Sequence, residues 1–187
     1  MKTILRLLTI AMLTFFMNAC GSSSSGGGSS ESGGGDTVSD GYTKTGTITA
    51  TIDGSTKTFY TSKVDNPAGI VNSAIVTPGT NYLNVTIQAH PVVGLSTSGE
   101  VLTITILFPN GTLTTGTPES ASISYMVDGG FYTSAFPTVN IAVATQNGST
   151  IHLEGTAQAT ISTVDSSSSK TVSVEFVVDA DEAIING

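Results

Sequence analysis

The sequence predicts an all-β domain, an antiparallel β-sandwich or partly open barrel of about 8–10 strands, preceded by a signal peptide and a disordered linker. Three observations support this fold class. Apolar and polar residues alternate from residue 45 onward, as in strands with one buried face. Turns that contain Gly or Pro recur about every ten residues. Charged residues make up only 11% of the chain, helix formers are scarce, and Ser, Thr and Gly are abundant.

Residues 1–19 have the composition of an export signal. Lys2 and Arg6 form a basic start, and an apolar run of 11 residues extends from Leu7 to Met17. This run is too short to span a membrane, which takes about 20 residues. We therefore predict a signal peptide and not a membrane-spanning anchor.

The signal ends in Met17-Asn18-Ala19-Cys20-Gly21, which resembles the lipobox of bacterial lipoproteins. The resemblance implies cleavage before Cys20, lipidation of its thiol and attachment of the mature chain to a membrane. An ordinary secretory signal with an incidental cysteine is the alternative. Gly21 stands where many inner-membrane lipoproteins carry Asp, so the resemblance implies the outer membrane and leaves open its periplasmic or external face.

Residues 20–41 are predicted to be a lipidated cysteine followed by a disordered tether. Nearly all residues from Gly21 to Gly35 are Ser or Gly, which cannot bury enough apolar surface to offset chain entropy. About twenty such residues give a mean reach on the order of 25 Å. Residues 42–187 then form a single domain of ordinary size.

Within this domain, the first predicted strand is Thr45–Ile52. It ends at Asp53-Gly54, a strong two-residue hairpin signal, and Thr58–Thr61 is the returning strand. The same alternation identifies the later strands by their inward apolar residues. The predicted core is Ile48, Ala50, Ile52, Leu83, Val85, Ile87, Ala89, Leu102, Ile104, Ile106, Phe108, Ile123, Tyr125, Val127, Val139, Ile141, Val143, Ile151, Leu153, Ala157, Ala159, Ile161, Val172, Val174, Phe176 and Val178.

Gly and Pro also place the predicted connections between these strands. Longer connections are expected over Thr112–Ser120 and Asp65–Ile70, and a bulge or bend is expected at Gly155. Short turns are expected at residues 77–80, 109–111, 128–130 and 146–149.

The segment Thr47–Gly54 followed by Phe59, together with Gly155–Ile161 and Val174–Phe176, resembles a group of β-sandwich lipoproteins of unknown function. In those proteins a strand that ends in a D/N-G turn opens the sandwich and a hairpin closes it. The resemblance implies no catalytic residues.

Composition excludes several classes of function. The exported part has four lysines and no arginine against 14 acidic residues, a net charge of −10. Nucleic-acid binding needs clustered cations on the phosphates, so we exclude it. Cys20 is the only cysteine, which excludes an internal disulfide, a thiol catalyst and a zinc–thiolate site in the domain. We predict no cofactor and no metal.

The titratable residues form no recognisable catalytic motif. No G-x-S-x-G or S-x-x-K pattern surrounds a serine. His90 is expected at the edge of a loop, and His152 is expected to face solvent beside Glu154 rather than to form a metal or acid/base site. The run Asp179–Glu182 lacks the pattern of an EF-hand and is expected to be a solvated C-terminal tail.

Threonine faces and aromatic residues are the remaining candidates for binding. Runs of the T-x-T type occur in ice-binding β-proteins, but regular repeats are missing here, and Thr is favoured on the wet side of a sheet. Among the aromatic residues, Phe131-Tyr132 is the expected exposed pair. The T-x-T runs consist of Thr47, Thr49 and Thr51, and of Thr103 and Thr105; Tyr42 and Tyr60 are further possible platforms.

The sequence thus predicts a lipid-anchored envelope protein whose non-catalytic β-sandwich binds a protein or glycan partner or is structural. One alternative is a hydrolase of envelope or extracellular polymers that uses carboxylates brought together by folding. A second is a small-ligand carrier with an apolar cavity. The candidate carboxylates are those of Glu100, Glu119, Glu154 and Glu175.

Overall fold

The computed structural model describes residues 37–38, 41–66, 69–94, 99–134 and 136–182. The contacts of the chain divide it into residues 1–34 and 35–187, and all described residues belong to the second unit. The predicted signal peptide, Cys20 and most of the tether lie outside the described residues.

The described part consists of strands and connections, which confirms the predicted all-β class. The strand count exceeds the expected range because short strands such as β1 and β4 show no alternation to detect. The strands are β1 (Thr37–Val38), β2 (Tyr42–Ile52), β3 (Ser55–Asn66), β4 (Gly69–Asn72), β5 (Ala74–Pro78), β6 (Tyr82–Ala89), β7 (Val101–Pro109), β8 (Ser120–Val127), β9 (Gly130–Ser134), β10 (Thr138–Asn147), β11 (Thr150–Ser162) and β12 (Ser169–Glu182).

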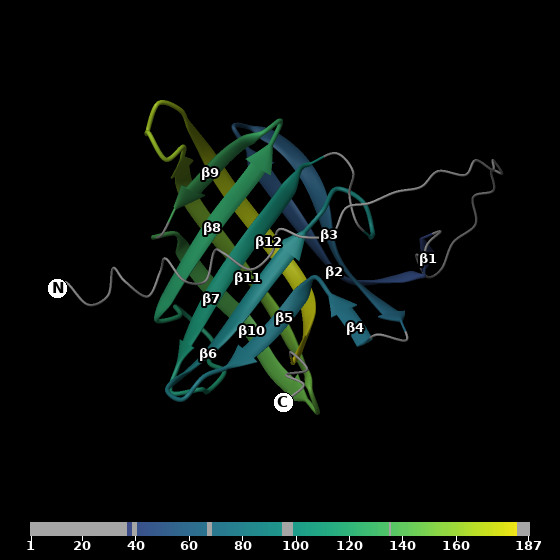
Figure 1. Ribbon diagram of the computed structural model, residues 1–187. Helices are drawn as coiled ribbons and strands as arrows, with labels where there is room; N and C mark the ends of the chain where they lie inside the picture. The colour runs from purple at the N-terminus through teal and green to yellow at the C-terminus, as the bar shows by residue number, and fades with distance from the viewer. Residues whose placement is uncertain (1–36, 39–40, 67–68, 95–98, 135, 183–187) are drawn as a thin grey trace, which may run out of the picture. The chain divides into compact units, whose positions relative to one another are not determined.

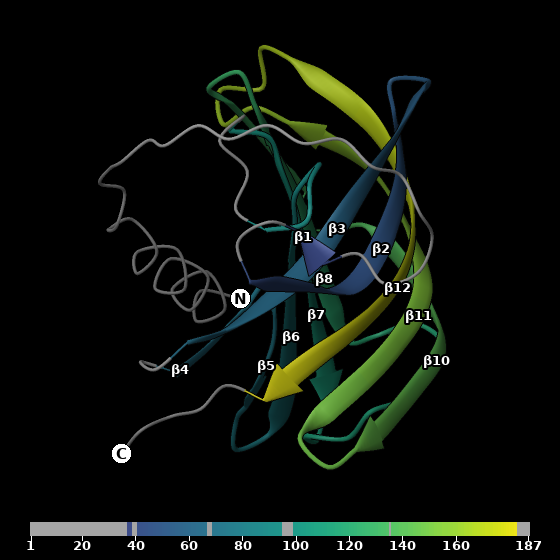
Figure 2. The ribbon, with the colours of Figure 1, turned by 90° about the vertical axis from the view of Figure 1, so that its right-hand side faces the viewer.

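The strands form two layers that face each other (Figures 1 and 2). We call β10-β11-β12-β2-β3-β4 the large sheet and β5-β6-β7-β8-β9 the small sheet, each named in the order of its pairing. The sheets join at two corners, where β11 pairs with β9 through Ser162 and Thr133, and β12 pairs in parallel with β5. The hydrogen-bonded network therefore closes on itself, as expected for a sandwich or partly open barrel.

The hairpin turns have the backbone geometry that their sequences predict. Asp53 and Gly54 between β2 and β3 both have positive φ, 49° and 82°, and so do Asp128 and Gly129 between β8 and β9, 49° and 77°. Positive φ at both central residues is the geometry of a type I′ turn, whose twist matches the flanking strands. These two turns set the register of both hairpins.

The core lies between the two sheets and contains nearly all of the residues predicted for it. Val127 and Ala159 are only partly buried and pack against its margin. The prediction that Val143 belongs to the core is wrong. A bulge between Ile141 and Val143 in β10 reverses the alternation, so that Ala144 packs on the core side instead.

Three local predictions need correction. The irregularity expected at Gly155 is present, but the extra residue lies in β10 opposite this glycine. Asp65 and Asn66 end β3 and pair with Ile70 and Gly69 of β4, so this region is a hairpin and not a long connection. Residues 179–182 are not a tail: β12 continues through them, because Ala180 is fully buried and holds the strand against the core.

Candidate functional site

The outer face of the large sheet carries polar side chains in rows set by strand register. This arrangement confirms that Thr47, Thr49 and Thr51 lie on the side of β2 opposite the core. The rows near the β2–β3 turn consist of hydroxyl and amide side chains, with Asp53 of the turn beside Thr171, and we call them the hydroxyl rows. They are Thr56, Thr51, Ser173, Gln158 and Thr138 in one row, and Thr171 and Thr160 in the next.

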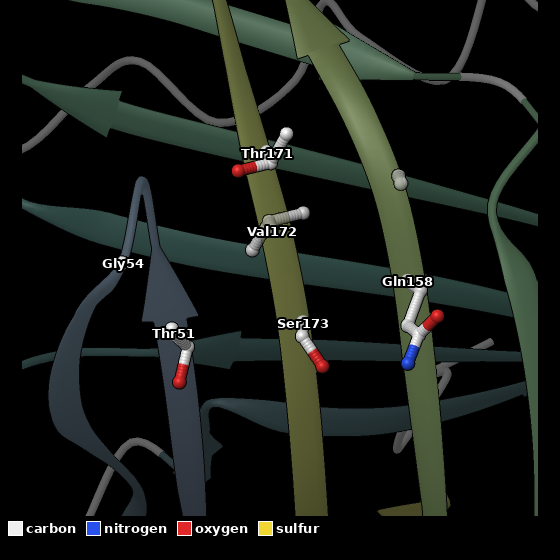
Figure 3. A pocket seen from close by; sticks show the side chains of 7 residues that line it. Thr51, Gly54, Gln158, Thr171, Val172 and Ser173 are labelled. Carbon is white, nitrogen blue, oxygen red and sulfur yellow. The ribbon is translucent and has the colours of Figure 1, made fainter.

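A depression on this face lies over the hydroxyl rows (Figure 3). Thr51, Ser173 and Gln158 contribute to it from the neighbouring strands β2, β12 and β11, and the hydroxyl groups of Thr51 and Ser173 point the same way. Their register makes Thr51 the direct neighbour of Ser173, and Ser173 the direct neighbour of Gln158. The depression therefore presents several neutral donors and acceptors at fixed spacing.

The other end of the face is charged and centres on His152, which faces outward as predicted. Its Nδ1 lies 2.7 Å from Oδ1 of Asp179, and its Nε2 lies 3.1 Å from Oε1 of Glu154. The hydrogen bond with Glu154, followed by that with Asp179, raises the pKa of His152. As an imidazolium, His152 can donate to both carboxylates and link β11 to β12.

This arrangement does not resemble a metal site. The two nitrogens of an imidazole ring point in different directions, so the carboxylates that contact them lie on different sides of the ring. Among the described residues, no group of three or more His, Cys, Asp or Glu side chains is placed to hold a metal ion. The geometry of His152 fits an ionic cross-link between strands.

Two β-bulges flank this charged cluster. The extra residue is Thr45 in β2, and Ala142 in β10. Each bulge has a tightly packed glycine beside it: a Cβ on Gly46 would lie 2.6 Å from Cγ1 of Val178, and one on Gly155 would lie 2.6 Å from the carbonyl oxygen of Asn140. A shallow depression also lies here, and its lining includes Lys44, Thr47, Val177 and Asp179.

Asp181, near the C-terminal end of β12, is paired as well. Oδ1 of Asp181 accepts a 2.6 Å hydrogen bond from the hydroxyl of Thr150, and its Oδ2 lies 3.6 Å from Nζ of Lys63. The acidic run is thus part of the contacts between strands.

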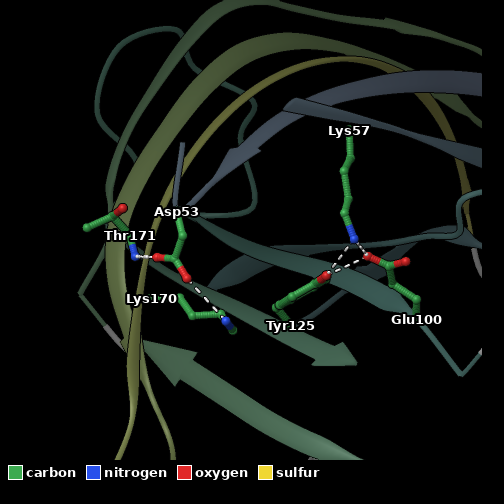
Figure 4. Close-up of polar contacts among 6 residues, drawn as sticks. All are labelled: Asp53, Lys57, Glu100, Tyr125, Lys170 and Thr171. Atoms are coloured by element: carbon green, nitrogen blue, oxygen red, sulfur yellow. Dashed lines mark hydrogen bonds and ion pairs between the residues drawn. The ribbon is translucent and has the colours of Figure 1, made fainter. Parts of the chain in front are cut away.

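A second polar cluster connects the two sheets and was missed by sequence reasoning (Figure 4). Nζ of Lys57 on β3 donates to Oε1 of Glu100 at 2.6 Å, and the hydroxyl of Tyr125 on β8 donates to the same oxygen at 2.5 Å. The ring of Tyr125 also packs edge-on against Phe59, with centroids 6.4 Å apart. Lys57 could have been noticed, because it shares the inward side of β3 with Phe59.

The contacts within this cluster shift the pKa values of all three side chains. Burial, followed by the hydrogen bond to Glu100, raises the pKa of Tyr125 to about 12. Burial alone would raise the pKa of Glu100, but the hydrogen bonds from Lys57 and Tyr125 leave it below its ordinary value. The hydrogen bond to Glu100 raises the pKa of Lys57. At neutral pH the cluster is therefore an ammonium, a carboxylate and a neutral phenol.

His90 lies at a further connection between the sheets. It follows β6, as predicted, but it is only 7% exposed, and its Nδ1 makes no hydrogen bond. Its backbone forms a bridge with Tyr60 of β3, through hydrogen bonds of 2.7 and 3.0 Å. Burial lowers the pKa of His90, so the side chain is neutral at physiological pH.

The candidate carboxylates do not all come together. Glu100 belongs to the cluster with Lys57, and Glu119 lies just before β8, where its backbone nitrogen bonds to Leu107. Glu154 and Glu175 are diagonal neighbours on the outer face, because Glu175 pairs with Thr156. Diagonal neighbours in a sheet lie roughly 7–8 Å apart.

The aromatic pair expected at the surface is less exposed than predicted. Phe131 and Tyr132 are both half-buried, and Nζ of Lys170 lies 5.1 Å from the centre of the Tyr132 ring. The sequence around Tyr132 contains no signal of this distant lysine. Phe136, two residues beyond β9, is far more exposed, at 93%, and Tyr82 is exposed at 41%.

No protein-family model matches this chain, and no curated protein matches it. In the described part of the chain, no helix has the length and hydropathy needed to cross a membrane.

Proposed function

We propose that this chain is a lipid-anchored protein of the bacterial cell envelope whose β-domain binds a partner or is structural, without catalysis. The observation that carries the proposal is the pentapeptide Met17–Gly21, which follows a basic start and an 11-residue apolar run. Cys20 within it is the only thiol in the chain, so one residue can be tested for one modification.

Metabolic labelling with a palmitate analogue tests the anchor. We expect label on the wild-type chain and none on Cys20→Ala, which should also remain unprocessed. Ser22→Ala is the matched control, because it changes a neighbour of similar size and should leave labelling intact. Equal labelling of wild type and Cys20→Ala, or no labelling of either, would overturn the proposal.

The proposed location is the outer membrane, and separation of the two membranes on a density gradient tests it. In an enterobacterial host we expect the wild type in the outer-membrane fraction. Gly21→Asp should move it to the inner membrane, because this change introduces the retention residue. Recovery of the wild type with the inner membrane would contradict the location without affecting the lipid assignment.

The geometry of the domain supports binding. His152 has both ring nitrogens engaged by carboxylates of its own sheet, an arrangement that fits an ionic cross-link between strands. The two depressions described above lie on the outer face of the large sheet, where a large partner has access. For a small-ligand carrier, neither of the two depressions is enclosed, because both are open to solvent.

A hydrolase is the second candidate, and one observation favours it. Glu154 and Glu175 are diagonal neighbours on one face of the sheet, which brings two carboxylates onto adjacent strands, and glycosidases act through a pair of carboxylates. If the domain hydrolyses envelope polymers, Glu175→Gln should abolish release of soluble fragments, while Glu119→Gln should not. Absence of fragment release by the wild type eliminates this candidate.

A further inference from the structure

The depression over the hydroxyl rows has a distinct chemical character. Its polar side chains are those of Thr51, Gln158, Thr171 and Ser173, and its volume is about 460 Å³. Hydroxyl and amide groups both donate and accept hydrogen bonds. A ligand rich in hydroxyl groups has the same dual capacity, so each of its groups can find a partner here in more than one orientation.

Charge selects further among such ligands. No charged side chain lines the depression. The nearest charged pair is Asp53 with Lys170, 3.1 Å apart, and Oδ1 of Asp53 also accepts the backbone N–H of Thr171 at 2.9 Å. The exported part carries ten net negative charges, which disfavours anionic polymers. The complementary ligand is therefore neutral.

The backbone positions of the lining residues are fixed before any ligand arrives. Thr51, Ser173 and Gln158 lie directly opposite one another on paired strands, and the hydroxyl of Thr51 lies 3.1 Å from that of Thr56. The short side chains of Thr51 and Ser173 lose little freedom on binding, whereas the longer side chain of Gln158 must be ordered by the ligand. Positions fixed by strand register suit an extended ligand that repeats its own hydroxyl groups.

The depression also lies far from the point where the tether enters the domain. The short strand β1 pairs with the start of β2 at Tyr42 and Thr43, and Thr51 lies nine residues beyond Tyr42 along β2. At 3.3 Å per residue this distance is about 30 Å. A domain anchored through its N-terminal tether can thus present the depression to material beyond the membrane surface.

From these observations we infer that the depression formed by Thr51, Gln158, Thr171 and Ser173 binds a neutral glycan chain. The inference rests on the proposed binding function and names the class of partner. The depression lacks an aromatic stacking platform, so each contact is weak, with a dissociation constant on the order of 1 mM. Many copies on one membrane would strengthen attachment to a polymer through avidity.

An array of immobilised glycans tests the inference with the full lipidated chain in detergent micelles. The array carries neutral oligosaccharides of hexoses and N-acetylhexosamines beside sulfated and uronic-acid oligosaccharides. We expect retention on neutral glycans that changes little with salt. The double variant Thr51→Val/Ser173→Ala should weaken it about tenfold, because two hydrogen-bonding groups are lost.

The matched control is Thr105→Val/Ser122→Ala. These two residues are also direct cross-strand neighbours, but they lie on the outer face of the small sheet. The control should bind as the wild type does, and circular dichroism should give the same spectrum for all three proteins. The inference would be overturned if the wild type bound only anionic glycans or bound no glycan. It would also be overturned if the wild type and the Thr51/Ser173 variant bound neutral glycans equally well. Because Cys20 labelling is measured separately, such a failure leaves the lipid-anchor proposal standing.

Discussion

At the scale of single residues, Tyr125 shows how a polar group can be accommodated at the margin of an apolar core. This residue is 2% exposed, its ring packs on Phe59, and its hydroxyl reaches Glu100. We expect Tyr125→Phe to keep the ring contact and lower the free energy of unfolding by about 1–2 kcal/mol, since a hydrogen bond to a charged group is lost. Urea unfolding measures the loss.

The control for this prediction is Tyr82→Phe. Tyr82 is 41% exposed, and its hydroxyl forms no hydrogen bond within the described structure, so the variant should unfold like the wild type. An equal loss in both variants would show that the contact between Tyr125 and Glu100 contributes nothing.

The same residues show what could be predicted from the sequence. Period-two alternation identified Tyr125 and Phe59 as strand residues, because alternation depends only on neighbours along the chain. The partnership of Lys57 with Glu100 depends on contacts 43 residues apart, which no local pattern contains. The same limit applies to His152, whose outward direction followed from alternation but whose contact with Asp179 required the register of β11 and β12.

At the scale of strands, the two kinds of glycine have different roles. Gly54 lies in a turn with φ at 82° and open space around it, so only its backbone geometry requires glycine. Gly155 lies inside β11, where an added Cβ would meet the Asn140 carbonyl oxygen at 2.6 Å and the Phe176 ring at 2.7 Å. Sequence reasoning detected a break at Gly155 but could not place the extra residue in β10, because the bulge belongs to the partner strand.

We therefore expect unequal costs from the same substitution. Gly54→Ala should destabilise the domain by about 1 kcal/mol, the cost of a left-handed backbone with a side chain. Gly155→Ala should cost about 2–3 kcal/mol, because the bulge and the core must both move. Thr156→Ala on the outer face of β11 is the control. Equal losses at the two glycines in chemical denaturation would refute this distinction.

At the scale of the whole molecule, the two histidines make stability depend on pH in opposite ways: one lowers it as pH falls, and the other lowers it as pH rises. His90 at the connection between the sheets has its pKa lowered by burial, so the unfolded chain binds its proton more readily. Its contribution is fully present above the unfolded pKa of about 6.5 and is lost as pH falls toward the folded pKa. His152 has its pKa raised by Glu154 and Asp179, so its contribution is fully present below about 6.5 and is lost as pH rises through the folded pKa.

These signs predict a stability maximum near pH 6.5, to be measured as the free energy of unfolding between pH 5 and 8. His152→Gln should flatten the alkaline side of the curve, whose slope is shallow because His152 and its partners are more than a third exposed. His90→Gln should flatten the acidic side between about pH 5 and 6.5, above the range in which ordinary carboxylates titrate. Should His90→Gln fail to fold, the chemical shift of the His90 ring in the wild type provides the same test. A midpoint at or above 6.5 would contradict the assignment, because a buried imidazole without a partner for Nδ1 resists protonation.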